Sequence, residues 1–179
     1  MIEVSITEQM IKNARIHAAK DHARYGYYKT VSDVFSYKAR LIGALGEEVI
    51  SDYFNTDLTN TRDFDIIINQ QCVEIKSQII NSCKIKSHFE CNIFKPSIGC
   101  DRYMFVFVHS SLTKAWIVGT CSKDEFDYKS YYSHPLIKGR KTVPNHHIKI
   151  QDLEEVESWL TRLSRTAKEF GLMQRQADS

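Results

Sequence analysis

Two carboxylates and a lysine stand close together in residues 64–77, and their spacing suggests a shared chemistry. Apolar residues flank Asn69-Gln70 on both sides, so the segment is predicted to be a β-hairpin with a tight turn at these two residues. Counting outward from that turn puts Asp65 opposite Glu74, with Cβ atoms about 5 Å apart on one face. Lys76 points to the same face, because successive side chains of a strand alternate between the two faces.

Paired carboxylates beside a single lysine favour a divalent cation. One lysine cannot neutralise both acids, whereas Mg²⁺ prefers carboxylate oxygens and keeps several waters. A bound Mg²⁺ would acidify a water and hold a phosphate oxygen, while the Lys76 ammonium stabilises or orients the attack. The pattern therefore predicts metal-assisted hydrolysis of a phosphodiester. Gln78 falls on the same face as a further accessory residue, and Asp63 is a reserve ligand.

This prediction depends on the length of the turn. A three-residue turn would pair Asp65 with Ile75 and would place the two carboxylates on opposite faces of the hairpin. Asn-Gln is not a strong signal for a two-residue turn, so the sequence alone leaves both registers open.

These residues resemble the core of a known nuclease superfamily. Asp65 followed by Glu74-Ile75-Lys76 is similar to the D…(D/E)-x-K pattern of the PD-(D/E)XK nucleases. Residues 43–50 are similar to the G-x-x-G-E helix of their Holliday-junction-resolvase-like members, and the resemblance spans roughly residues 40–120. It implies a restriction-endonuclease-like fold, dependence on Mg²⁺ with Mn²⁺ as a substitute, and cleavage of DNA that is structured, nicked or foreign.

The resemblance also implies a set of ligands and leaves one of them open. The proline of the family motif is absent, since Phe64 precedes Asp65. Helical geometry does not distinguish Glu47 from Glu48 as the acid of the upstream helix, and the family pattern favours Glu47. The implied metal ligands are Asp65, Glu74, the main-chain carbonyl of Ile75 and, as an outer or second-metal contact, Glu47.

Apolar periodicity predicts the elements that must position these residues. The expected helices are 6–24, capped by Ser5 or Thr7, a second one from about 31–36 to Phe54, and a last one that begins near Asp152. A strand buried on both faces is expected at 103–108, with a hairpin partner at 115–119. Trp116 and Trp159 are predicted to lie in the core.

Together these elements predict one nuclease domain over residues 1–179. We expect an α/β fold with a restriction-endonuclease-like mixed central sheet flanked by helices. Its parts would be an N-terminal helix within 1–30, a catalytic core at 36–120, a basic loop region at 121–150 and a C-terminal helix at 151–171.

The composition excludes several classes of protein. With 42% hydrophobic and 26% charged residues and only 3 Pro and 7 Gly, the chain is neither disordered nor fibrous. No apolar run approaches about 18 residues and the first residues lack a signal-peptide pattern, so we expect a soluble cytoplasmic protein without membrane contact. The five cysteines form no C-x-x-C pair, which predicts reduced thiols and no metal–thiolate site.

The distribution of charge identifies candidate contacts to DNA, the expected partner. A net charge of +2 is too small to require a nucleic acid by itself. Residues 138–149 hold four Lys or Arg and no acid, which is typical of a phosphate-contacting loop or of a solvated loop. The candidate DNA contacts are Lys84, Lys86, Lys95, Arg102, Lys138, Arg140, Lys141 and Lys149.

Several aromatic residues and histidines allow two interpretations. Two groups of tyrosines could stack on unpaired bases or pack as half-buried aromatics, namely Tyr25, Tyr27 and Tyr28, and Tyr128, Tyr131 and Tyr132. The pair His146-His147 is predicted to lie on the surface or to face DNA.

Two other functions compete with a nuclease. One is a nucleic-acid-binding protein that keeps the fold without turnover. The other is a non-enzymatic assembly protein whose amphipathic terminal helices make the contacts. The first helix could also form a homodimer interface.

Overall fold

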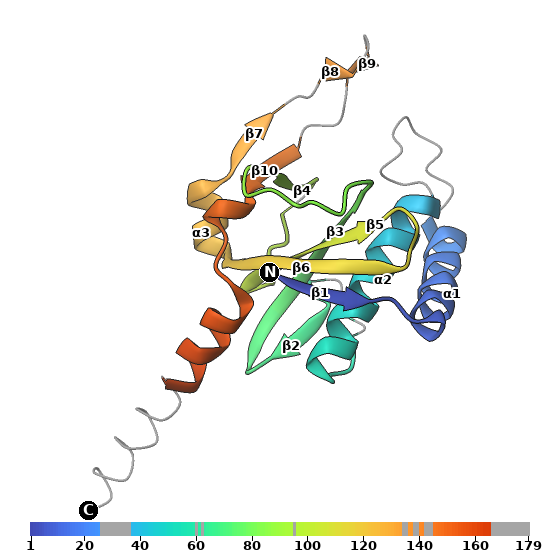
Figure 1. Ribbon diagram of the computed structural model, residues 1–179, viewed down its shortest axis with the longest axis horizontal. Coiled ribbons are helices and arrows are strands. Elements are labelled where there is room, and N and C mark those ends of the chain that lie inside the picture. The colour runs from blue at the N-terminus through green and yellow to red at the C-terminus, as the bar shows by residue number, and fades with distance from the viewer. Residues whose placement is uncertain are drawn as a thin grey trace, which may run out of the picture.

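The computed structural model describes residues 1–25, 37–59, 61, 63–94, 96–133, 136–137, 140–141 and 145–165 (Figure 1). The helices are α1 (Glu8–Tyr25), α2 (Tyr37–Phe54) and α3 (Lys123–Lys129), with a short 3-10 helix η2 (Ile150–Asp152) and a helical stretch at 156–165. The strands are β1 (Ile2–Ser5), β2 (Ile66–Ile68), β3 (Gln71–Ile80), β4 (Glu90–Ile93), β5 (Arg102–His109), β6 (Lys114–Ser122), β7 (Tyr131–Ser133), β8 (Leu136–Ile137), β9 (Arg140–Lys141) and β10 (Asn145–Lys149).

A mixed five-stranded sheet forms the centre of the fold. Its strand order is β1-β6-β5-β3-β2, in which β3 and β5 run parallel and the other neighbours run antiparallel. Helices α1 and α2 pack against each other, and α2 contacts β3 (Figure 1). The predicted α/β class, with a mixed central sheet flanked by helices, is therefore confirmed, and the expected strands 103–108 and 115–119 are β5 and β6.

Two apolar clusters cover the two faces of this sheet. Leu45 of α2 belongs to the first cluster together with Val73 and Ile75 of β3. On the opposite face, Phe105 of β5 packs with Phe126 of α3. Both tryptophans are buried as predicted, and all five cysteines are free thiols. Because side chains alternate along a strand, β3 contributes to both faces.

The N-terminus differs from the sequence prediction. Ile2–Ser5 form the edge strand β1, paired antiparallel with β6, instead of leading directly into a helix. The side chains of β1 alternate between half-buried and exposed, a signal too short to stand out in four residues. The helix begins at Glu8, and Thr7 caps it by accepting a hydrogen bond from the Met10 amide at 3.2 Å. The expected start of the second helix before Tyr37 lies outside the described residues.

The expected basic loop region at 121–150 contains regular structure, so that prediction is wrong. Ser122 and Glu125 form a reciprocal capping box that starts α3. Strands β4, β10 and β7 form a three-stranded antiparallel sheet, in that order, which we call the second sheet. Its inner side packs on the second apolar cluster, to which Ile93 and Ile148 belong.

The C-terminal helix starts later than predicted. Glu154 pairs with Thr120 through two backbone hydrogen bonds, which keep the chain extended beyond Asp152 until the helical stretch 156–165. Residues 166–171 of the expected helix lie outside the described part of the chain. No helix among the described residues is long and apolar enough to cross a membrane.

Candidate functional site

The hairpin of β2 and β3 has the two-residue turn considered in the sequence analysis. Ile68 pairs with Gln71 across the turn, and Ile66 pairs with Val73. The two turn residues, Asn69 and Gln70, have φ values of 49° and 66°, the left-handed pair that a type I′ turn requires. This register excludes the three-residue alternative. The pairing ends at Ile66, so Asp65 lies just outside the strand and its position is defined by its own contacts to β3.

Asp65 directly precedes β2 and continues the contact with β3 by its amide and its side chain. Its amide donates to the Val73 carbonyl at 3.0 Å, and its carboxylate Oδ2 accepts from the Ile75 amide at 2.7 Å. The N–H and C=O of a strand residue point to the same edge, so the Ile75 carbonyl faces the edge at which the Asp65 carboxylate lies.

Glu74 and Lys76 lie on one face of β3 and form an ion pair between Lys76 Nζ and Glu74 Oε1. Their side chains are only 14% and 24% exposed respectively, so both groups have lost most of their contact with water. This face is opposite to the one that α2 covers, because Val73 and Ile75 point to the helix.

Glu47 reaches the same region from α2. A Cβ atom at Gly46 would lie 1.7 Å from Ser77 Oγ, so only glycine allows the helix to pack this closely on β3. Glu47 follows directly, and its charge raises the pKa of Asp65 and of Glu74.

Glu48 points elsewhere. Its carboxylate accepts a hydrogen bond from the Asn13 side-chain Nδ2 at 2.9 Å, and Glu48 lines a polar pocket of about 450 Å³ between α1 and α2. The structure thus distinguishes the two glutamates that the sequence left open. His17 of α1 lies 3.8 Å from Glu47 Oε2, a neighbour that the sequence analysis did not identify because the contact joins two helices.

The site holds more carboxyl groups than its one lysine can pair with. The pKa of Asp65 is raised to about 8, mainly by burial and further by the charges of Glu47 and Glu74. The hydrogen bond from the Ile75 amide and the charge of Lys76 act to lower it. Burial also raises the pKa of Glu74, while Lys76 lowers it. A second cation would relieve this excess of buried acid.

The donor set fits Mg²⁺ chemically. Asp65 and Glu74 offer carboxylate oxygens and Ile75 offers a carbonyl facing the same edge, which are the hard ligands that Mg²⁺ prefers. Within the described residues, however, no three His, Cys, Asp or Glu side chains lie close enough to hold a metal ion. Glu47 therefore lies near the two-carboxylate site without completing a cluster of three side chains.

Gln78 has a different role from the expected accessory one. Its amide nitrogen donates to the Glu90 carbonyl at 2.9 Å, and its amide oxygen accepts from the Asn92 amide at 3.3 Å. The side chain thus ties β3 to β4. Asp63 is exposed, and its charge contributes to the raised pKa of Glu74.

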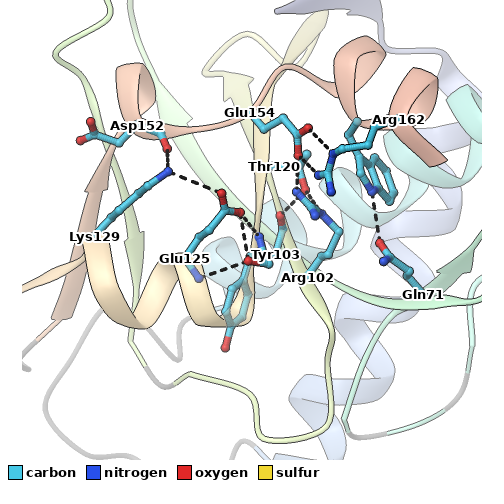
Figure 2. A network of polar contacts seen from close by, with 11 residues as sticks. Gln71, Arg102, Tyr103, Thr120, Glu125, Lys129, Asp152, Glu154 and Arg162 are labelled. Atoms are coloured by element: carbon cyan, nitrogen blue, oxygen red, sulfur yellow. Dashed lines mark hydrogen bonds and ion pairs between the residues drawn. The ribbon is translucent and has the colours of Figure 1, made fainter. Parts of the chain in front are cut away.

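Arg102 does not belong to a DNA-contacting surface, contrary to the sequence prediction. It is only 3% exposed and lies over the Trp159 ring. Its guanidinium donates to Thr120 Oγ1 at 3.2 Å and to the Glu154 carboxylate at 2.8 Å, and Glu154 also accepts from Arg162 (Figure 2). Arg102 therefore joins the central sheet to the C-terminal helix.

The other predicted contacts fall into two groups. Lys84, Lys86 and Lys149 are exposed. Lys95 and Lys138 lie outside the described residues, as do the side chains of Arg140 and Lys141, of which only the backbone in β9 is described.

His147 is not a surface residue, so that prediction is wrong. It is buried in the second sheet, with Nε2 2.8 Å from Ser133 Oγ and Nδ1 3.5 Å from a Glu90 oxygen. His146 is half-buried and lies close to the Phe126 and Tyr132 rings.

Comparisons of this chain with protein-family models, with curated proteins and with solved structures found no match. The assignment of a function therefore rests on the residues of the hairpin and on their geometry.

Proposed function

We propose that this protein is a Mg²⁺-dependent DNA endonuclease with a PD-(D/E)XK-like active site, for which Mn²⁺ can replace Mg²⁺. The observation that carries the proposal is the hairpin, in which the Asp65 carboxylate accepts from the Ile75 amide, between Glu74 and its ion-pair partner Lys76. The raised pKa of both carboxyls supports it, because an acid pair that one lysine does not neutralise favours a divalent cation.

Some of these residues would bind the metal, and others would contact the reacting phosphate or the attacking water. Asp65, Glu74 and the Ile75 carbonyl would hold the metal, which supplies an activated water and a contact to a phosphate oxygen. Lys76 shares its face with Glu74, so its ammonium can donate hydrogen bonds to the attacking water or to the phosphate. Glu47 would act as an outer contact from α2, with His17 Nδ1 3.8 Å from its Oε2.

The test is a cleavage assay with supercoiled, linear, single-stranded and four-way-junction DNA in Mg²⁺, Mn²⁺ or EDTA. We expect cleavage with either metal and none in EDTA. Lys76→Ala should lower the rate by about 100-fold or more, since it removes a charge next to the reacting phosphate. Metal-independent cleavage, or full activity of Lys76→Ala, would contradict the mechanism.

Glu47→Gln and Glu48→Gln provide a matched pair of variants. They make the same chemical change at adjacent positions of α2, yet Glu47 is among the charges that raise the pKa of the hairpin acids, whereas Glu48 is bonded to Asn13. We expect Glu47→Gln to lower the cleavage rate by about tenfold or more, and Glu48→Gln to change it by less than about twofold. Equal effects of the two substitutions on the cleavage rate would show that Glu47 is not part of the active site.

A second candidate is a nucleic-acid-binding protein that has lost turnover. The lack of a three-side-chain metal cluster within the described residues favours it. This protein would bind DNA equally well in EDTA and in Mg²⁺ and would cleave none of the four substrates.

A further inference from the structure

The second sheet lies beside the proposed catalytic strand. The Gln78 side chain bonds to the backbone of β4 at two points, and Gln78 follows Lys76 by two positions on the same face of β3. The inner residues of the second sheet pack on the central sheet. Whatever binds the second sheet is therefore held at a fixed position relative to the proposed nuclease site.

Tyr131 of β7 is an aromatic side chain held in place from one side. Its ring stacks on the His147 ring with centroids 5.3 Å apart and an angle of 18° between the planes. Its hydroxyl donates to the Glu90 carboxylate, and His147 is in turn bonded to Ser133. Tyr131 nevertheless stays 43% exposed, so a second planar group can stack on the ring without reordering it.

The exposed side chains of the second sheet are aromatic or polar. They are Asn92, Tyr131, Tyr132 and Lys149. The aliphatic residues Ile93 and Ile148 point inward and are buried. Tyr128, just before β7, is 89% exposed. Aromatic rings next to cations are the groups through which single-stranded nucleic acid is bound.

The cations that such a strand requires lie in the second sheet and in the segment that precedes β4. Lys149 is exposed at the end of β10, where it pairs with Glu90 of β4. The segment 87–89, which follows Lys84 and Lys86, is hydrogen-bonded to residues 150–151 at 2.9 and 3.0 Å. Glu90 is an acid next to these lysines. Its carboxylate accepts a hydrogen bond from the Tyr131 hydroxyl and lies close to His147.

We propose that the second sheet binds single-stranded DNA, with a base stacked on Tyr131 and phosphates held by Lys84, Lys86 and Lys149. This inference rests on the proposed nuclease function and specifies its substrate class, which is DNA with an unpaired stretch next to the cleaved bond. The stacking of His147, Tyr131 and a base would form one continuous column.

The test is fluorescence anisotropy in EDTA with a labelled single strand of about 20 nucleotides and with the matching duplex. Tyr131→Leu removes the aromatic face and keeps an apolar side chain over His147. We expect it to weaken single-strand binding by roughly 5- to 100-fold and duplex binding by less than about twofold. Tyr131→Phe should bind like the parent protein. Tyr53→Leu, at an exposed tyrosine of α2, serves as the control.

Each result decides the proposal separately from the nuclease assignment, because binding is measured without metal. Equal loss for single strand and duplex, or no loss, would overturn stacking on Tyr131. Equal weakening by Tyr131→Phe and Tyr131→Leu would also overturn it, since the bond to Glu90 would then be the cause. Selective loss in Tyr131→Leu together with no cleavage of any substrate would support the proposal and reject the nuclease function alone.

Discussion

At the scale of single residues, the carboxyl of Asp65 makes the stability of the protein depend on pH. Its pKa is raised from 3.8 to about 8 in the folded state. Between these values the unfolded chain releases the proton while the folded protein keeps it, so stability falls as pH rises. The loss amounts to at most about 1.4 kcal/mol per pH unit and is complete above the folded pKa.

We therefore predict that Asp65→Asn flattens this dependence. The amide oxygen can still accept the Ile75 hydrogen bond, but the side chain no longer titrates. Urea unfolding in EDTA at about pH 5, 6, 7 and 8 measures the effect. The free energy of unfolding of the variant should exceed that of the parent protein most at about pH 8. Added Mg²⁺ should stabilise the parent more at about pH 8 than at about pH 5. Parallel pH curves for the two proteins would contradict the raised pKa.

Residues in one hairpin could be predicted from sequence, and residues that meet across the fold could not. The period of two along a strand puts Glu74 and Lys76 on one face, and the two-residue turn brings Asp65 beside them. Arg102 looked like a surface cation because the sequence shows its charge but not its partner Glu154, which is 52 positions away. His17 was missed for the same reason.

At the scale of elements, the contact between α2 and β3 positions Glu47 and depends on a single glycine. An added Cβ at Gly46 would overlap Ser77, at 1.7 Å from Oγ and 2.8 Å from Cβ. We predict that Gly46→Ala lowers the free energy of unfolding by about 1–3 kcal/mol, because the helix must move away from the strand. The cleavage rate should fall as well, since Glu47 moves with the helix.

Gly43 in the same helix is the matched control. Nothing lies within 4 Å of a Cβ at this position. Gly43→Ala should therefore stabilise the protein by about 0.5–1 kcal/mol through the better helix propensity of alanine. Urea unfolding of both variants checks the pair. If Gly46→Ala is as stable as Gly43→Ala, close packing of α2 on β3 does not position Glu47.

Helices and strands with a strong hydrophobic period could be predicted from the sequence, whereas elements that are specified by their pairing partners could not. The buried run of β5 and the amphipathic α2 are visible in the sequence. The edge strand β1 is four residues long and is specified by its pairing with β6. The start of α3 did carry a local signal, the capping box of Ser122 and Glu125, which the charge of the region obscured.

At the scale of the whole molecule, one buried arginine fastens the C-terminal helix to the sheet. Arg102 bonds to Glu154 and Thr120 (Figure 2). Its guanidinium also lies over the Trp159 ring. Arg102→Ala should cost about 3 kcal/mol in urea unfolding, because a buried ion pair and its packing are lost. Arg162→Ala should cost no more than about 1 kcal/mol, since the Arg162 side chain is 57% exposed. If the two variants lose the same free energy of unfolding, the burial of Arg102 does not contribute to stability.

The distribution of charge over the molecule determines how its affinity for DNA depends on salt. The net charge of +2 gives little general attraction to DNA, so binding must come from a local group of cations. For single strands the logarithm of affinity falls against the logarithm of salt by about 0.7 per phosphate contacted. Replacing Lys149 of the second sheet and Lys84 and Lys86 of the segment before β4 by Gln should therefore reduce the slope by about 2.

The control removes the same charge from the exposed side of α1, at Lys12, Arg15 and Lys20. Both triple variants lower the net charge from +2 to −1, because three cations are lost in each. A general electrostatic effect would change both slopes equally, whereas phosphate contacts at the second sheet change only the first. Anisotropy titrations between about 50 and 200 mM salt measure the slopes. A slope reduced only by the α1 variant would move the DNA-binding surface to the helical side of the molecule.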